Sequence, residues 1–340
     1  MKKIISLCIS LALLALIYWK IDFAKLGPVF RQCDPWWMFA SLAMVVPLTL
    51  LTSWRFQQLA PADARVGFAE ANRLILSASV LNLVLPSKMG DIAKALFIPG
   101  LRRSLALSLV VFEKACDMLS LLIWCVFGLA WVWMAGGTPM QAFDPARWFA
   151  QLGASSPLPA WISPGLVFAM VALVVAGSLA LGLLLLGSGR FAGYFFALGQ
   201  RRAPGKLKGK FQKMGFSWSE MHGYFWASRS RLALVSGTSI IIWLLHLLQI
   251  WLFIIALRAA CPFLANLALS PLAILAGLFP LTFAGVGTRD FALVLLYAAY
   301  FGAPTAAALG LLCTARYVLP AIGGIPFFQR YLALVRAPRQ

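Results

Sequence analysis

The sequence predicts an all-α polytopic membrane protein. Of its 340 residues, 62% are hydrophobic and only 11% are charged, whereas a soluble domain averages about 25% charged residues. Several apolar runs exceed roughly 18 residues, the length that a helix needs to cross a membrane. Two other apolar runs are interrupted by proline, glycine and charged residues. These observations predict a single integral membrane domain, residues 1–340, with about six full spans and two re-entrant helical hairpins.

The first part of the chain, residues 1–134, is predicted to hold three spans. Residues 4–19 follow two lysines as in a signal peptide, but no small-residue cleavage site comes after them, so we interpret them as span 1. Residues 36–54 are predicted as span 2, with tryptophans at both ends as interface anchors. Arg55 directly follows this span and is interpreted as a snorkelling interface residue, with contact to a lipid headgroup as the alternative. Residues 105–134 are predicted as span 3.

A broken stretch, residues 74–98, lies between spans 2 and 3. Pro86 removes a backbone donor and Gly90 loosens the turn, so a hairpin of two half-helices is expected instead of one continuous helix. Basic residues flank the stretch on both sides, which indicates that both of its ends face the cytoplasm. Charged side chains at membrane depth cost roughly 2.5 to 3.5 kcal/mol each on insertion scales, so we expect a functional reason for them.

The middle part, residues 135–231, contains span 4 at 161–186 and a long basic segment at 188–231. Because Lys and Arg mark cytoplasmic loops, this segment and both termini are predicted to be cytoplasmic. The predicted location is the cytoplasmic (inner) membrane of a bacterium. A surface helix that contacts anionic lipid headgroups is one interpretation of the basic segment, and a solvated run of charge is the other.

The last part, residues 232–340, contains span 5 at 232–257, a second broken stretch at 268–301 and span 6 at 305–328. The flanks of the second stretch are poor in Lys and Arg, so this hairpin is expected to enter from the outside. The two hairpins would then dip in from opposite faces. Broken segments at matching positions of two halves are the signature of an inverted repeat, which we state as a hypothesis.

The net charge and the few cysteines and histidines argue against nucleic-acid binding and metal binding. In a membrane protein, a net charge of +19 indicates cytoplasmic loops and anionic lipid, so no nucleic-acid partner is expected. Six scattered cysteines and two histidines show no metal-ligand spacing, so neither a metal nor a cofactor is expected. Cys33 and Cys261 fall in predicted external loops, where a disulfide between them is an alternative to free thiols. His246 and Gln249 share a face of span 5, which favours a polar contact between helices over a proton relay.

The candidate site residues lie in the two broken stretches and in neighbouring spans. Each break precedes a helix start, and the free N–H groups of a half-helix suit a phosphate or carboxylate near the membrane midplane. Ser87 or Gly90 is expected to cap the first such helix, and Thr288 the second. The predicted substrate-binding residues are Asn82, Ser87, Lys88, Lys94, Thr288, Arg289 and Arg316.

Acidic residues are predicted to balance charge or to couple the protein to protons. Glu113 and Asp117 lie four residues apart and therefore share a helix face. Paired carboxylates in a low dielectric repel unless a cation bridges them or one is protonated, and Lys94, Arg289 or Arg316 is the expected cation. The alternative is that the charges only pair with one another and pin the helix breaks. The acidic residues in this group are Asp91, Glu113, Asp117 and Asp290.

Three motifs in order resemble the flippase-like transmembrane family, which includes the membrane half of lysylphosphatidylglycerol synthases and stand-alone YbhN-type and HpnL-type proteins. The motifs are Asn82-x-x-x-Pro86-x-x-x-Gly90-Asp91-x-x-Lys94, Phe112-Glu113-Lys114-x-x-Asp117 and Pro280-x-x-x-x-Gly285-x-Gly287-x-Arg289-Asp290. The resemblance implies an integral lipid transporter or flippase. The soluble aminoacyl-transfer domain of the synthases is absent from this sequence, so aminoacylation is not predicted.

The predicted function is to move an anionic or amphiphilic lipid between leaflets. The lipid is expected to be a phospholipid, a polyprenyl-phosphate-linked lipid or a hopanoid-related lipid, with its headgroup held at the two half-helix N-termini. Two alternatives stay open. One is an intramembrane lipid-modifying enzyme with Glu113 and Asp117 as acid and base. The other is a non-transporting partner of a lipid-synthesis complex. The first interpretation is preferred, so no enzymatic activity and no catalytic residue are predicted.

Overall fold

A computed structural model describes residues 23–60, 66–84, 90–93, 103–159, 161–278 and 287–336. Within these residues every regular element is a helix, which confirms the predicted all-α class. Predicted span 1 and the central residues of both broken stretches lie outside the described residues.

In the part of the chain that the structure describes, five helices are long and apolar enough to cross a membrane, and they correspond to predicted spans 2 to 6. The first is formed by α3 (Pro35–Ala43) and α4 (Val45–Leu59), which join at Met44. The others are α7 (Arg103–Ala135), α10 (Pro164–Gly187), α13 (Arg229–Ala256) and α16 (Ala303–Arg336). The chain is therefore an integral membrane protein that crosses the membrane several times.

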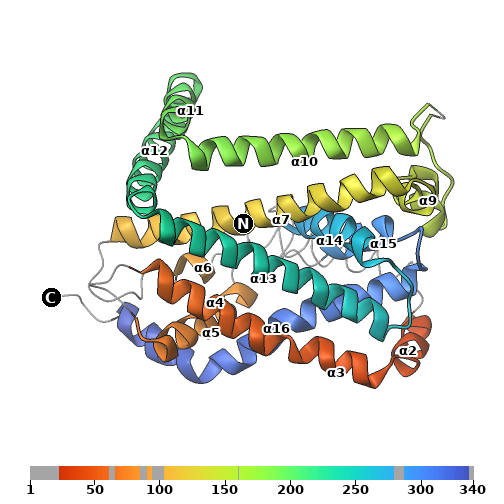
Figure 1. Cartoon of the computed structure of the whole chain (residues 1–340). Coiled ribbons are helices and arrows are strands. Elements are labelled where there is room, and N and C mark those ends of the chain that lie inside the picture. The colour runs from red at the N-terminus through yellow and green to blue at the C-terminus, as the bar shows by residue number, and fades with distance from the viewer. Residues whose placement is uncertain are drawn as a thin grey trace.

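The spans run side by side along one axis and alternate in direction (Figure 1). At one end, α11 (Gly189–Arg202) and α12 (Gly205–Trp226) lie across this axis. The short helices α2 (Phe23–Arg31), α8 (Gly137–Gln141) and α9 (Pro145–Gln151) lie at the opposite end. The two ends of the bundle thus differ in structure.

Helix α10 stands at the edge of the bundle and packs against α7. Its apolar side chains point outward, with Leu173 76% and Val174 67% exposed. Because a helix satisfies its own backbone hydrogen bonds, such an apolar face is suited to contact lipid tails.

The two arms of each predicted hairpin are in contact. Helix α5 (Phe68–Val84) packs against α6 (Gly90–Ala93), and α14 (Phe263–Leu278) packs against α15 (Thr288–Leu296). In Figure 1, α5 and α6 lie toward the end that carries α11 and α12, whereas α14 and α15 lie toward the other end. The re-entrant paths and the inverted repeat stay predictions, because the breaks lie outside the described residues.

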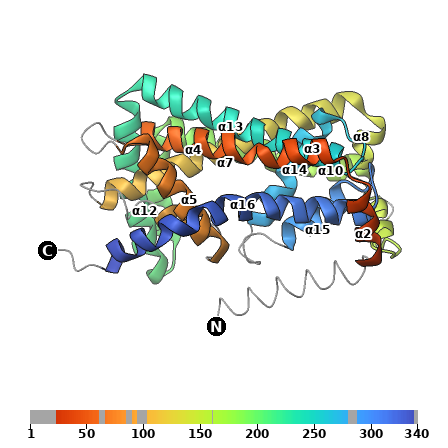
Figure 2. The ribbon, with the colours of Figure 1, turned by 90° about the horizontal axis from the view of Figure 1, so that it is seen from below.

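Glycines allow close approach at three helix crossings. A Cβ atom on Gly90 would lie 2.6 Å from the carbonyl oxygen of Ala78 in α5. A Cβ on Gly128 of α7 would collide with the backbone of Ala268 in α14, and one on Gly324 of α16 would collide with the backbone of Leu76 in α5. Small residues at helix crossings are typical of membrane proteins. Helices α16 and α5 also lie side by side in Figure 2.

Two predictions about single residues are settled by the packing. Cys33 and Cys261 are both free thiols, so the disulfide alternative is wrong for this structure. Gln249 of α13 donates its side-chain N–H to the carbonyl oxygen of Ser41 in α3, at 2.9 Å. This bond confirms the predicted polar contact between helices.

Candidate functional site

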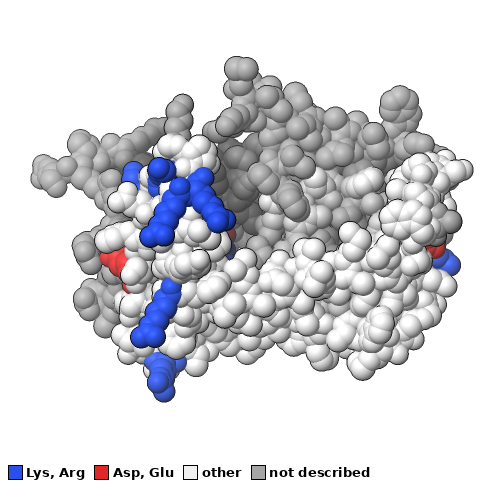
Figure 3. Space-filling model, turned by 90° about the horizontal axis from the view of Figure 1, so that it is seen from above, with Lys and Arg blue, Asp and Glu red and all other residues white. Residues whose placement is uncertain are grey.

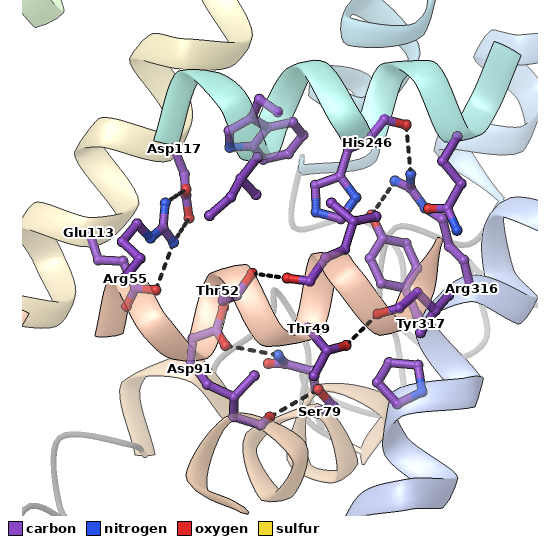
Figure 4. Close-up of a pocket in the computed structure, with 18 of the residues that line it drawn as sticks. Thr49, Thr52, Arg55, Ser79, Asp91, Glu113, Asp117, His246, Arg316 and Tyr317 are labelled. Atoms are coloured by element: carbon purple, nitrogen blue, oxygen red, sulfur yellow. Dashed lines mark hydrogen bonds and ion pairs between the residues drawn. The ribbon is translucent and has the colours of Figure 1, made fainter. Parts of the chain in front are cut away.

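A cavity of about 200 Å³ lies inside the bundle between α4, α5, α7, α13 and α16. Figure 4 shows the side chains of these helices pointing toward it. Its charged lining, among the described residues, consists of Arg55, Asp91, Glu113, Lys114, Asp117 and Arg316. Charged groups within membrane spans are costly unless they are paired or serve a function. The partners of each charge therefore decide what the cavity can do.

Arg55 bridges the two carboxylates of α7. Its Nη2 atom lies 2.8 Å from Oε1 of Glu113, and its Nη1 atom pairs with Asp117 and donates to Ser239 Oγ at 2.7 Å. Arg55 is 1% exposed and Glu113 is fully buried. The planar guanidinium has several donors in a fixed geometry, which lets one side chain bind both acids.

Two interpretations of the sequence are therefore wrong. Arg55 is not a snorkelling interface residue, because α4 continues to Leu59 and carries Arg55 inside the bundle. The cation that bridges Glu113 and Asp117 is Arg55, and neither Arg289 nor Arg316 takes that position. Lys94 lies outside the described residues.

A second set of contacts ties α6 to the same cluster. Nζ of Lys114 lies 2.7 Å from Oδ2 of Asp91 and 3.1 Å from Oδ2 of Asp117. Asn82 of α5 donates to Oδ1 of Asp91 at 3.1 Å. The fold therefore brings Asn82, Asp91, Glu113 and Asp117 together, as residues predicted for the site.

Arg316 lies across the cavity from the Arg55 cluster (Figure 4). Its side chain is 4% exposed. It donates to the carbonyl oxygen of His246 at 3.3 Å and to the hydroxyl of Tyr317 at 2.8 Å, and it lies 4.8 Å from the centroid of the Tyr317 ring. No carboxylate in the described part of the chain pairs with Arg316, and its Nε atom has no hydrogen-bond partner there. A buried guanidinium without an anion is costly, so this position favours an anionic ligand.

Arg289 and Asp290 form a separate, closed cluster between α15 and α16. Arg289 is 4% exposed and donates to Oδ1 of Asp290 at 2.9 and 2.6 Å. It also donates to the carbonyl oxygens of Gly310 and Cys313 and to the hydroxyl of Thr314. The guanidinium is therefore engaged by the protein itself. Neither Arg289 nor Thr288 is among the described residues that line the cavity.

The start of α15 is also filled from within the protein. Gly287 is the N-cap residue, with a φ of 99°, and Thr288 is the first residue of the helix, so the prediction that Thr288 is the cap is wrong. The Gly287 N–H donates to Oδ2 of Asp290 at 3.2 Å. The carboxylate of Asp290 occupies the place where the sequence predicted an anionic ligand.

A family model for the lysylphosphatidylglycerol synthase TM region matches residues 3–324. The chain belongs to this family. The match confirms the resemblance that the three motifs indicate, and membership points to a function related to membrane lipids. No curated protein matches the chain.

In this member of the family, the described residues of the three motifs lie at two places in the fold, the cavity and the start of α15. Asn82, Asp91, Glu113, Lys114 and Asp117 surround the cavity, whereas the third motif supplies the closed Arg289 cluster. Ser87, Lys88 and Lys94 lie outside the described residues. Their predicted role in substrate binding stays a prediction.

Sequence reasoning missed one polar wall of the cavity. Thr49, Thr52 and Arg55 line it from α4. They are spaced three residues apart, so they form a polar stripe along one face of an otherwise apolar span. That spacing is visible in the sequence and would have indicated that Arg55 faces the interior.

Proposed function

We propose that this protein moves an anionic or amphiphilic membrane lipid between leaflets, as a transporter or flippase. The observation that carries the proposal is Arg316, a buried guanidinium that faces the cavity without a carboxylate partner among the described residues. The phosphate of a lipid headgroup would supply the missing anion through charge-assisted hydrogen bonds. A phospholipid, a polyprenyl-phosphate-linked lipid and a hopanoid-related lipid with an anionic group all meet this requirement.

The ion-pair network of Arg55 and Lys114, on the cavity wall opposite Arg316, supports the same proposal. Arg55 and Lys114 hold Asp91, Glu113 and Asp117 in a network that spans α4, α6 and α7. We propose that this network balances charge, or couples to protons, while the headgroup passes. The re-entrant hairpins predicted from the sequence would admit the headgroup from either face.

The basic residues at one end of the bundle indicate how the protein is oriented in the membrane. Lys and Arg side chains gather over α11 and α12 (Figure 3). The exposed ones are Arg190, Arg201, Arg202, Lys208, Lys210 and Lys213. We propose that this basic end faces the cytoplasm of a bacterial cell and contacts anionic headgroups of the inner membrane.

The position of α12 suits such a contact. The indole N–H groups of Trp218 and Trp226 donate to the carbonyl oxygens of Leu185 and Leu186, at 3.0 and 3.1 Å. These bonds satisfy two of the carbonyl groups at the end of α10, which otherwise lack helical partners. Helix α12 is thereby held at the level where the α10 span ends, and we propose that lipid headgroups lie at this level.

The test is translocation in liposomes that contain the purified protein and lipids labelled on an acyl chain. We expect translocation above that of empty vesicles, and a loss of at least about tenfold in rate for Arg316→Gln. Arg147→Ala is the matched control, because Arg147 is an exposed arginine on α9. A protein that moves no lipid class faster than empty vesicles, or an Arg316→Gln variant with the full rate, would contradict the proposal.

The two alternatives are separable from transport. A lipid-modifying enzyme that uses Glu113 and Asp117 would make a new lipid species that disappears with Glu113→Gln. Both carboxylates are paired with Arg55, which favours a charge-balancing role over acid–base catalysis, so we propose that the chain is not an enzyme. A non-transporting scaffold would keep its function after Arg316→Gln and lose it when the basic residues of α12 are neutralised.

A further inference from the structure

Three hydroxyl groups on the cavity wall donate their hydrogen atoms to backbone carbonyl oxygens of their own helices. Thr49 donates to the carbonyl oxygen of Val45 at 2.7 Å, and Thr52 donates to that of Leu48 at 2.8 Å. Ser79 donates to the carbonyl oxygen of Ile75 at 3.0 Å. Each hydroxyl has one hydrogen and two acceptor lone pairs. Toward the cavity, these oxygens can therefore only accept.

Two amide oxygens on the same cavity have no partner in the described part of the chain. Gln249 is 1% exposed, and its Oε1 atom is buried without a hydrogen bond. Oδ1 of Asn82 is in the same state. The amide nitrogens of both side chains donate to oxygens, of Ser41 and of Asp91. These bonds fix the orientation of each amide, since a flip would bring two acceptors together.

Among the described residues, the Arg316 side of the lining carries unpartnered donors, whereas the opposite wall carries unpartnered acceptors. The Nε atom of Arg316 and the indole N–H of Trp243 are both buried donors without a partner in the described residues, and both residues line the cavity. Figure 4 shows Thr49, Thr52 and Ser79 between Arg316 and the Arg55 cluster. The cavity therefore offers donors for an anion and a neighbouring wall of acceptors for something else.

We infer that the lipid carried by this cavity has a headgroup that combines a phosphate with a hydrogen-bond donor, either a hydroxyl or an ammonium N–H. The phosphate binds Arg316 and Trp243, and the donor binds Gln249, Asn82 and the wall hydroxyls. This inference rests on the proposed transport function and narrows its substrate class. A bare phosphate headgroup lacks the donor above its second pKa, about 6, and a choline headgroup has a cation but no N–H.

The experiment compares four phospholipids that share one labelled acyl chain and differ in headgroup, in liposomes containing the full-length protein. We expect ethanolamine and glycerol headgroups to move about tenfold faster than choline and bare phosphate, because a headgroup without donors leaves buried acceptors unpaired. Choline keeps the phosphate and the positive charge of ethanolamine but has three methyl groups in place of its three N–H donors. Fast movement of ethanolamine alone would identify an ammonium, and of glycerol alone a hydroxyl; both results support the inference.

Two variants test whether the acceptor groups on the cavity wall cause the preference among headgroups. Thr52→Val and Gln249→Leu should each lower the ratio of the rate for the preferred headgroup to the rate for choline. Thr238→Val is the matched control, because Thr238 makes the same bond to its own helix, at 2.6 Å to Leu234, but is not among the residues that line the cavity.

The failures of the two proposals are distinguishable. Equal rates for all four headgroups would leave transport standing and overturn the inference, since water would then satisfy the wall. A headgroup preference that survives both wall variants would also overturn it. No translocation of any lipid would overturn the transport function and the inference together.

Discussion

The two arginines that line the cavity differ in their partners: Arg55 pairs with carboxylates, and Arg316 contacts neutral groups. Arg55 is bound to Glu113 and Asp117, both of which belong to the same helix face. Among the described residues, Arg316 has only neutral partners, the carbonyl oxygen of His246 and the hydroxyl of Tyr317. Removing one partner of a buried ion pair leaves the other charge uncompensated. Removing a charge that has no counterion does not have this consequence.

The two arginines should therefore respond differently to the same substitution. Arg55→Gln is expected to lower the free energy of unfolding by about 3–5 kcal/mol, because it removes the buried cation that bridges Glu113 and Asp117. Arg316→Gln is expected to change it by less than about 1 kcal/mol, or to raise it, because a desolvated charge is removed. Thermal unfolding of both variants in the same detergent measures the difference. Equal losses of stability would show that Arg316 has a structural counterion after all.

At the scale of helices, α5 and α16 approach at adjacent glycines. Gly324 lies against the backbone of Leu76, whereas a Cβ on Gly323 would lie 3.8 Å from the Leu76 side chain. The first contact leaves no room for a methyl group, and the second is an ordinary van der Waals distance. The crossing carries cavity residues of both helices, Ser79 of α5 and Arg316 of α16.

This difference predicts opposite effects of one added methyl group. Gly324→Ala should destabilise the protein by about 1–3 kcal/mol, because the helices must separate. Gly323→Ala is the matched control and should be neutral or stabilising, since alanine favours helix. Thermal unfolding of the two variants distinguishes them. A Gly324→Ala variant that unfolds like the wild type would mean that the crossing is looser than the structure shows.

At the start of α15, the protein itself fills the anion site that the sequence predicts. A helix N-terminus attracts anions, and the sequence places Thr288, Arg289 and Asp290 there. In the fold, Asp290 accepts from the N-cap N–H, and Arg289 binds Asp290 and the carbonyls of α16. This end of α15 therefore serves to attach two helices to one another.

At the scale of the whole molecule, the two ends of the bundle are chemically distinct. Cys33 lies between α2 and α3, at the end opposite α11 and α12. It is half-buried, whereas Cys261 is 9% exposed and burial raises the pKa of its thiol to about 12. Because the thiolate is the reactive form, Cys261 should stay unmodified near neutral pH.

Membrane orientation can be read from these thiols in a Cys8→Ser background. We expect a membrane-impermeant maleimide to modify Cys33 in intact spheroplasts, because the proposed orientation puts it outside. A new thiol at an exposed site on α12, Lys213→Cys, should react only after permeabilisation. Cys33→Ala is the control for the first signal. The reverse pattern would invert the orientation and place the basic end outside.

The sequence by itself determined the spans, because the length of an apolar run is a local property that needs no tertiary contact. Spans 2 to 6 therefore agree with the structure to within a few residues, and the three motifs agree with the family. The polar contact of Gln249 was predictable for the same reason, since a polar group on an apolar helix needs a partner.

Only the tertiary structure decided which charges meet. Arg55 lies 58 residues from Glu113 in the sequence, and their pairing depends on which face of α4 packs against α7. Arg289, by contrast, pairs with its sequence neighbour Asp290 in α15. The packing of the bundle leaves Arg316 without an acid among the residues that the structure describes. Pairing across helices is set by rotation and depth of each span, and the sequence encodes these only through the packing of the whole bundle.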